Sequence, residues 1–584
     1  MESGPASRST RDGATSVAFT NATLIDGTGA APRTGITVLV AEGRVAGIFP
    51  TGSRSLPANA RVVNVAGKFL LPGFIDAHVH ITYPFITRPR QDSILTFLFH
   101  GGVTAVRDLA GDAVALSALK NTARAPSVGW PQVYYSAVMA GAEFMRTDRR
   151  LTPVAHGLTS GEAPWLRAIK DSTDILLAIQ VARWTGATGI KLYAELPASL
   201  VVKLSEEAHR QGLKVWSHSA IVPARPSDAV ASGVDVLSHG DVLVLEGNDT
   251  MPATLAGYNS ARRYAAVPVE SQAITTLLEH MVRRGTMLEP TLYQNSRYGA
   301  FVQKDTARRA LWPLAEWSYA LTRRAQGLGV RVVAGTDLMG WPATDSLPYI
   351  HDEMELLVTK AGFTPLQALT SATLNGARSI GIEHDYGTAS VGKIASFVIL
   401  RSDPTVDIRN TRTVDLIVKE GVIHQRAWPA ALSSQSLERA PLDSTRIIAR
   451  SGVQPAGTTA APQSEIWKEV VARNRAMEQA AGSGSMLGVA RTYSDDSRII
   501  GAGGRAIASG RTAIDAYWSA IRDAKTWQLD VIEVGGSRDM PYQLGRSTLV
   551  LRSERGERSV VTNFLIIWKR NASGTLEVYL HHYN

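Results

Sequence analysis

The chain has 584 residues, 45% of them hydrophobic, and carries 61 Lys and Arg against 52 Asp and Glu, a net charge of +9. This apolar fraction excludes wholesale disorder, and the length predicts several domains. Because the chain contains no cysteine, disulfides, thiolate metal sites and cysteine nucleophiles are excluded, so any metal must be held by nitrogen and oxygen ligands.

The first predicted unit, residues 15–66, is built of short strands. Its apolar, β-branched runs are separated by Gly-containing turns at residues 26–27 and 42–43. Residues 386–430 return to the same pattern, with a turn at 420–421. We expect these two segments to pair, so that both flanks of the central segment build one composite β-sandwich.

The central segment, residues 67–385, alternates short apolar runs with amphipathic helical stretches. In the stretch 200–211, for example, Leu200, Leu204 and Ala208 fall on one helical face. Strand candidates alternating with helices favour a (β/α)₈ barrel over a doubly wound sheet. The eight apolar runs are residues 69–75, 103–107, 133–137, 189–192, 214–217, 234–237, 287–291 and 330–334.

The remainder of the chain is predicted to be a linker followed by a second domain. Residues 431–463 are rich in Ser, Thr, Pro and Gly, which is typical of a linker. Residues 464–584 contain helical patterns near 465–481 and 513–524, and then alternating strands over 527–583. The predicted fold class is therefore α/β: a TIM-like barrel with a small flanking β-sandwich, plus a C-terminal α+β domain.

The surface charge gives little indication of a partner. The densest basic cluster is interleaved with acidic residues: Arg552, Glu554, Arg555, Glu557 and Arg558. This favours a solvated mixed-charge surface, so we expect no nucleic-acid partner.

The sequence contains no run of about 18 apolar residues, so we expect no membrane-spanning helix. Residues 1–13 lack the apolar stretch of a signal peptide. We expect a cytoplasmic protein from the chain as given, or an extracytoplasmic one if a signal peptide has been removed.

The strongest chemical signal ends the first barrel strand. Residues i and i+2 of a strand point the same way, so His78 and His80 project together from one strand end. Barrel enzymes carry their chemistry at the C-terminal ends of the strands. Two convergent imidazoles are natural ligands for zinc or a similar divalent metal; the alternative is two polar loop histidines.

Four further candidates follow at later strand ends: Lys191, His218, His239 and Asp337. A single His there is usually a satisfied polar residue, but a Lys inside an apolar strand needs a carboxylate partner or must lose its charge. Carbamylation by carbon dioxide would turn the lysine into a carboxylate-like ligand able to bridge two metals. The regular placement on strands 1, 4, 5, 6 and 8 favours one shared site.

Nearby residues give weaker signals. Tyr193 faces the same side as Lys191 and is a candidate for binding substrate or an oxyanion, or for packing. His156 lies in a long stretch after the third strand that could cap the site. Arg107 and Asp108 end the second strand and could pair with each other.

These motifs resemble the amidohydrolase superfamily, above all its imidazolonepropionase-related and Xaa-Pro dipeptidase-type branch. The resemblance extends over residues 17–425. It rests on residues 71–80, 100–108, 186–192, 209–218, 234–240, 335–337 and 364–381.

The resemblance implies a binuclear site with two divalent ions, expected to be zinc. One ion would be bound by His78, His80 and Asp337, and the other by His218 and His239, with carboxylated Lys191 and a hydroxide bridging them. In this scheme the hydroxide attacks the scissile carbonyl, and Asp337 takes its proton and returns it to the leaving amine.

The implied activity is hydrolysis of an amide or peptide bond in a dipeptide or N-acyl amino acid, a small-molecule or peptide-like substrate. The deaminase branch typically places a His-x-x-Glu element at the fifth strand, whereas His218 is followed by four residues without a carboxylate. Together with Lys191, this favours hydrolysis over deamination. The alternatives are an ester, lactone or phosphotriester hydrolase on the same site and, from another class, a non-catalytic binding scaffold.

The last domain resembles the polyketide-cyclase and ketosteroid-isomerase-like cone. We expect it to serve oligomerisation, in a homo-oligomer, or substrate recruitment; the alternative to a cavity is a packed core with a dimerising sheet. Candidates for lining a cavity are Tyr493, Asp495, Trp518, Trp568 and His581.

Overall fold

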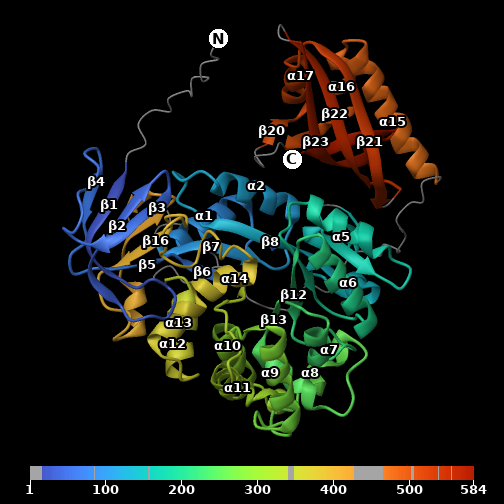
Figure 1. Ribbon diagram of the computed structural model, residues 1–584. Helices are drawn as coiled ribbons and strands as arrows, with labels where there is room; N and C mark the ends of the chain where they lie inside the picture. The colour runs from blue at the N-terminus through green and yellow to red at the C-terminus, as the bar shows by residue number, and fades with distance from the viewer. Residues whose placement is uncertain are drawn as a thin grey trace, which may run out of the picture.

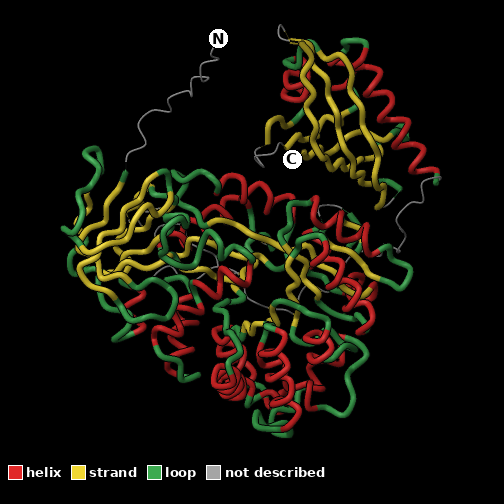
Figure 2. The backbone as a smooth tube through the Cα atoms, in the orientation of Figure 1, coloured by secondary structure: helices red, strands yellow, loops and turns green. Residues whose placement is uncertain are grey.

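The computed structural model places most of the chain in a barrel, a flanking sheet and a C-terminal α+β domain (Figures 1 and 2). Residues 156–157, which include the predicted capping residue His156, and the predicted linker 431–463 lie outside the described residues. The structure describes residues 16–83, 86–155, 158–339, 347–425, 464–500, 506–536, 538–553 and 556–583.

The two flanks of the barrel contribute strands to one eight-stranded sheet. Strand β5 joins them, because its Leu71 is the antiparallel partner of Val398 in β16 while its Phe69 pairs in parallel with Thr23 of β1. The sheet runs in the order β18-β17-β16-β5-β1-β2-β3, with β4 beside β1. Its strands are β1 Val17–Leu24, β2 Arg33–Ala41, β3 Arg44–Pro50, β4 Arg61–Asn64, β5 Phe69–Pro72, β16 Phe397–Leu400, β17 Val414–Lys419 and β18 Val422–Gln425.

The barrel strands are parallel neighbours in the order β14-β13-β12-β11-β8-β7-β6-β15. The eighth strand is irregular: β15 pairs with β6 at Leu338 and Val79, and a bridge between Leu288 and Val332 closes the ring. The predicted (β/α)₈ architecture is confirmed. The strands are β6 Phe74–His80, β7 Val103–Asp108, β8 Gln132–Gly141, β11 Gly189–Leu192, β12 Lys214–His218, β13 Val236–Ser238, β14 Met287–Glu289 and β15 Leu338–Met339, with a short hairpin of β9 Glu162–Ala163 and β10 Leu166–Ile169 beside β8.

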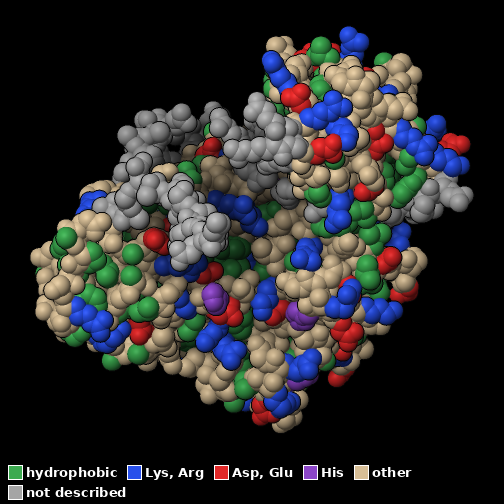
Figure 3. Space-filling model, turned by 45° about the horizontal axis from the view of Figure 1, so that its top comes forward, with side chains coloured by type: hydrophobic (Ala, Val, Ile, Leu, Met, Phe, Trp, Pro, Cys, Tyr) green, Lys and Arg blue, Asp and Glu red, His purple; other side chains and the backbone are tan. Residues whose placement is uncertain are grey.

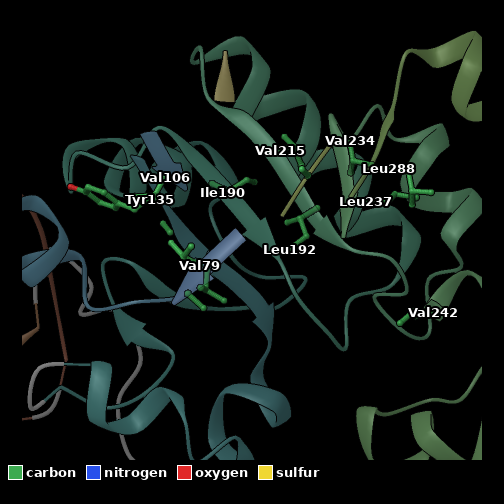
Figure 4. Close-up of a cluster of buried hydrophobic side chains, with 14 of the residues drawn as sticks. Val79, Val106, Tyr135, Ile190, Leu192, Val215, Val234, Leu237, Val242 and Leu288 are labelled. Atoms are coloured by element: carbon green, nitrogen blue, oxygen red, sulfur yellow. The ribbon is translucent and has the colours of Figure 1, made fainter. Parts of the chain in front are cut away.

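Apolar side chains of the barrel strands and the surrounding helices pack together in one buried cluster. Figure 4 shows Val79, Ile190, Val215, Leu237 and Leu288, each from a different strand, within one buried cluster. Val79 lies between the two histidines of β6, so its packing directs them to the opposite face of the strand.

The helices follow local signals in the sequence. Asp112 caps α2 by accepting hydrogen bonds from the backbone N–H groups of Val114 and Ala115, and α9 ends at Gly285 with φ of 75°. The main helices around the barrel are α1 Arg88–His100, α2 Ala113–Ala123, α5 Ile175–Trp184, α6 Ala198–Arg210, α7 Pro226–Ala231, α9 Gln272–Arg284, α10 Leu292–Val302, α11 Leu314–Leu328, α12 Ile350–Thr359, α13 Pro365–Ser371 and α14 Leu374–Ile380. Shorter ones are α3 Ala142–Thr147, α4 Leu151–Val154 and α8 Tyr258–Ala261. None of the described helices is long and apolar enough to cross a membrane.

The C-terminal domain packs three helices on one face of a six-stranded sheet. Tyr493, Trp518 and Trp568 belong to its buried core, whereas Asp495 points to solvent, with its side chain 90% exposed. The sheet runs β20-β19-β24-β23-β22-β21. Its elements are α15 Glu465–Gly482, α16 Met486–Ala490, β19 Tyr493–Ile500, β20 Ala506–Ser509, α17 Arg511–Ser519, β21 Ala524–Gly536, β22 Pro541–Ser553, β23 Gly556–Arg570 and β24 Leu576–Tyr583.

The other face of this sheet lies against the barrel. Leu544, Leu565 and Leu580 belong to the same buried cluster as the barrel core, and Ser117 of α2 contacts His582 at 3.5 Å. The same chain therefore covers one part of this sheet face, whereas Val561, farther along β23, is 57% exposed.

Candidate active site

The structure brings the six predicted ligands together at the C-terminal ends of the barrel strands. They come from β6, β11 and β12, from the residue after β13, and from the irregular eighth strand. All six line one cavity of about 260 Å³. They are His78, His80, Lys191, His218, His239 and Asp337.

The tightest part of the site contains His78, His80 and Asp337. Oδ1 of Asp337 lies 3.0 Å from Nε2 of His80 and 3.4 Å from Nε2 of His78. One ligand atom from each residue lies within 4.8 Å of the others. This group of two imidazoles and a carboxylate could hold a metal ion.

The other two histidines adjoin this group. The ring centroids of His218 and His239 are 4.8 Å apart, and those of His239 and His78 are 5.0 Å apart. His239 and Asp337 both adopt a left-handed backbone, with φ of 72° and 52°. Such conformations are uncommon outside glycine and concentrate at functional sites.

Lys191 lies buried beside these histidines. Its Nζ donates a hydrogen bond to Oγ of Ser238 at 2.9 Å, and 1% of the residue is exposed. Burial lowers the pKa of its ammonium from 10.5 to about 7, because the charged form is poorly solvated. The sequence expectation of a lysine in a site where its charge is disfavoured therefore matches its surroundings.

Electrostatics favour neutral imidazoles beside an ionised carboxylate. Burial lowers the pKa of His78 and His239, and it lowers that of His218 to about 3. Burial acts to raise the pKa of Asp337, but the imidazoles of His78, His80 and His239 outweigh it and keep that pKa well below its usual range. Neutral imidazole and carboxylate are the forms that bind metals.

Two buried ring nitrogens test whether the residues fit a metal. Nδ1 of His218 lies 3.1 Å from the carbonyl of Ala220, which leaves Nε2 as the other ring nitrogen available for a ligand. Nδ1 of His80 is buried and has no hydrogen-bond partner among the described residues. The imidazole nitrogens of the four histidines and the carboxylate oxygens of Asp337 are together suited to a divalent cation such as zinc.

Of the two predicted accessory residues, only Tyr193 can be placed. Its ring lies 5.3 Å from that of His218, and it lines the cavity. Its hydroxyl accepts a hydrogen bond from Nη2 of Arg150 at 3.2 Å, and the Arg150 guanidinium lies over the Tyr193 ring.

Sequence reasoning missed several residues of the cavity wall. Arg150 comes from the predicted capping stretch, whereas Tyr258 begins the short helix α8 and Arg262 follows it, in the long connection between β13 and α9. The Arg262 guanidinium lies 4.6 Å from the Tyr258 ring centroid and donates to Asp241 at 2.6 Å. These loops lack the periodicity that identified the strand-end residues.

The predicted pairing of Arg107 with Asp108 is wrong. Arg107 instead donates to the buried carboxylate of Glu289, which also contacts Nδ1 of His78 at 2.5 Å. Asp108 accepts from the backbone N–H of Ile81 at 2.6 Å. Successive side chains of a strand point to opposite faces, so the two residues diverge.

Comparison with known proteins identifies the family to which the barrel region is similar. The Amidohydrolase family model matches residues 69–424. Imidazolonepropionase of Symbiobacterium thermophilum is 25% identical, over 70% of this chain and 93% of its own length. An adenine deaminase of Deinococcus deserti is 26% identical, over 64% of this chain and 55% of its own length.

Solved structures share the fold. A Xaa-Pro dipeptidase with bound methionine is 19% identical with a TM-score of 0.55, and covers 70% of this chain and all of its own. Phenylurea hydrolase B is 20% identical with a TM-score of 0.56, over 72% of this chain and 99% of its own. At these identities both likenesses show the fold alone.

Proposed function

We propose a function from the premise that this chain belongs to the amidohydrolase family of hydrolases acting on carbon–nitrogen bonds. In this proposal the protein cleaves the amide bond of a dipeptide or an N-acyl amino acid. The observation that carries the proposal is the convergence of four histidines, one lysine and one aspartate on a single cavity. This set of groups is suited to metal-assisted hydrolysis.

In this proposal the site holds two divalent ions, expected to be zinc. When bound, they would polarise the scissile carbonyl and acidify the attacking water. His78, His80 and Asp337 would hold one ion and His218 and His239 the other, with carboxylated Lys191 between them. The buried position of Lys191 and its lowered pKa support this role, because a neutral amine is the form that reacts with carbon dioxide.

The protein's own groups would move the proton and orient the substrate. Asp337 faces the cavity, where its carboxylate would accept a proton from water and pass it to the leaving amine. Tyr193 would donate its hydroxyl hydrogen to the substrate. Arg150, which lies over Tyr193 in the cavity wall, would bind the substrate carboxylate.

We also propose a role for the C-terminal domain. Residues 464–584 would form a cone like those of polyketide cyclases, joined by the linker 431–463 to the barrel of residues 67–385 and its flanking sandwich of 15–66 and 386–430. The packing of its sheet against the barrel supports a stabilising role within the chain.

The test combines metal analysis with a substrate panel. Zinc-loaded protein is expected to contain two equivalents per chain and to hydrolyse N-acyl amino acids or dipeptides. Matched esters and lactones are assayed in parallel. Turnover of lactones without any turnover of amides would reverse the proposed substrate class, and a protein that binds no metal would refute the metal-assisted mechanism.

A further inference from the structure

A buried charged pair lies directly behind His78. Glu289 ends β14, and its side chain and that of Arg107 are both fully buried. Oε1 of Glu289 lies 2.5 Å from Nδ1 of His78, while Oε2 accepts a hydrogen bond from Nη2 of Arg107. Glu289 therefore connects a cavity-lining histidine to a cation that does not line the cavity.

Arg107 is fixed by further contacts. Its Nε donates to the carbonyl of Ala77 at 2.6 Å, and its Nη1 donates to the carbonyl of Ser379 at 3.1 Å. Its guanidinium lies 4.8 Å from the ring centroid of Trp216, whose Nε1 donates to the same Ser379 carbonyl. The position of the Glu289 carboxylate is thus set by β6, β7, β12 and α14 together.

This arrangement sets the orientation of the His78 ring. With Nδ1–H donating to Glu289, the lone pair of Nε2 faces the cavity, where Nε2 lies 3.4 Å from Asp337 Oδ1. The hydrogen bond made by one ring nitrogen determines which tautomer is present, and therefore which nitrogen can bind a metal. A carboxylate acceptor also makes the ligating nitrogen more basic.

We infer that Glu289, held in place by Arg107, is a positioning residue that presents Nε2 of His78 to a divalent ion. The inference rests on the proposed metal-dependent function. A purely structural role explains the pair less well, because a buried ion pair on its own is weak evidence for added stability.

Zinc affinity, measured by competition with a chromophoric chelator, tests the inference. Glu289→Leu removes the acceptor, and we expect its dissociation constant for the tighter zinc ion to rise about 100-fold. Glu289→Gln keeps an acceptor oxygen but loses the charge, so we expect a rise of about 10-fold. Glu353→Gln is the matched control: Glu353 is equally buried but accepts from the backbone N–H groups of Leu292 and Tyr293.

The outcomes separate this inference from the proposed function. If the wild type binds zinc and both Glu289 variants bind it equally well, the positioning role is wrong. An equal loss of affinity in Glu353→Gln would assign the effect to general destabilisation and would also overturn it. A wild type that binds no zinc would refute the proposed function and this inference with it. If Glu289→Leu does not fold by circular dichroism, the comparison of Glu289→Gln with Glu353→Gln decides.

Discussion

Nη1 of Arg167 lies 2.8 Å from Oε1 of Glu533, although Arg167 belongs to the barrel hairpin and Glu533 to the C-terminal sheet. Both side chains are buried, and the hydroxyl of Tyr542 contacts both charged groups. This polar cluster lies beside the apolar contacts of Leu544 and Leu565, so the covered sheet face combines both kinds of interaction.

Breaking this pair should loosen the C-terminal domain. Arg167→Met leaves the buried Glu533 carboxylate without its cation, which typically costs about 3–5 kcal/mol. We expect differential scanning calorimetry to show a separate, lower transition for the C-terminal domain. Lys525→Met is the control, because Lys525 and Glu557 form an exposed pair worth less than about 1 kcal/mol. An unchanged single transition in Arg167→Met would show that the contact does not couple the domains.

Replacing Lys191 should raise the stability of the protein and abolish its activity. Lys191→Met removes a buried amino group whose charged form is disfavoured and keeps an unbranched side chain, so we expect the chelator-treated variant to melt at a higher temperature at pH 7 than the wild type. The same variant should lose amide hydrolysis and bind fewer zinc equivalents per chain. Retained activity with two bound zinc ions would exclude the proposed bridging role.

The strand-end part of the site was predictable because strand geometry is periodic. His78 and His80 are two residues apart in a strand, and Lys191, His218 and His239 each lie within one residue of the end of a later barrel strand. Asp337 directly precedes β15 in the irregular eighth strand. Parallel strands of a barrel bring their C-terminal ends to one rim, so sequence order alone predicted the cluster.

The remaining contacts depend on packing between segments far apart in the sequence. Arg107 meets Glu289 across 182 positions, and no local pattern indicated that partner. A charged residue directly after the apolar pair Met287-Leu288 was a signal that could have identified Glu289. Arg150 and Arg262 lie on irregular segments, where side-chain direction follows from tertiary structure rather than from periodicity.

Glu353 should make stability depend on pH. Burial raises its pKa from 4.5 to about 8, despite the hydrogen bonds that its carboxylate accepts from Tyr293 and Leu292. The folded protein therefore keeps a proton that the unfolded chain releases above pH 4.5. The resulting stabilisation is fully present below pH 4.5 and is lost as the pH rises through about 8.

The Glu353→Gln variant carries a neutral amide at every pH, so its stability does not fall as the pH rises through about 8. We expect its free energy of unfolding, relative to wild type, to rise by at least about 1.4 kcal/mol between pH 5 and pH 8.5 in urea titrations of chelator-treated protein. The control is Glu355→Gln, a partly exposed residue of the same helix. Parallel pH profiles for wild type and Glu353→Gln would contradict the raised pKa.

Arg150 should distinguish substrates that carry a carboxylate. Its side chain is 45% exposed, lines the cavity and donates to the Tyr193 hydroxyl. A hydrogen bond to a charged group contributes about 1.5–3 kcal/mol, so Arg150→Gln should raise KM for N-acyl amino acids roughly 10- to 100-fold, with a smaller effect on kcat. For the same substrates with the carboxylate converted to an amide, KM should not change.

Arg146→Gln is the matched control, because Arg146 lies on the neighbouring helix α3 and pairs with Glu143 in solvent. An equal rise in KM for charged and amide-capped substrates would show that Arg150 acts through the position of Tyr193 rather than on the substrate carboxylate.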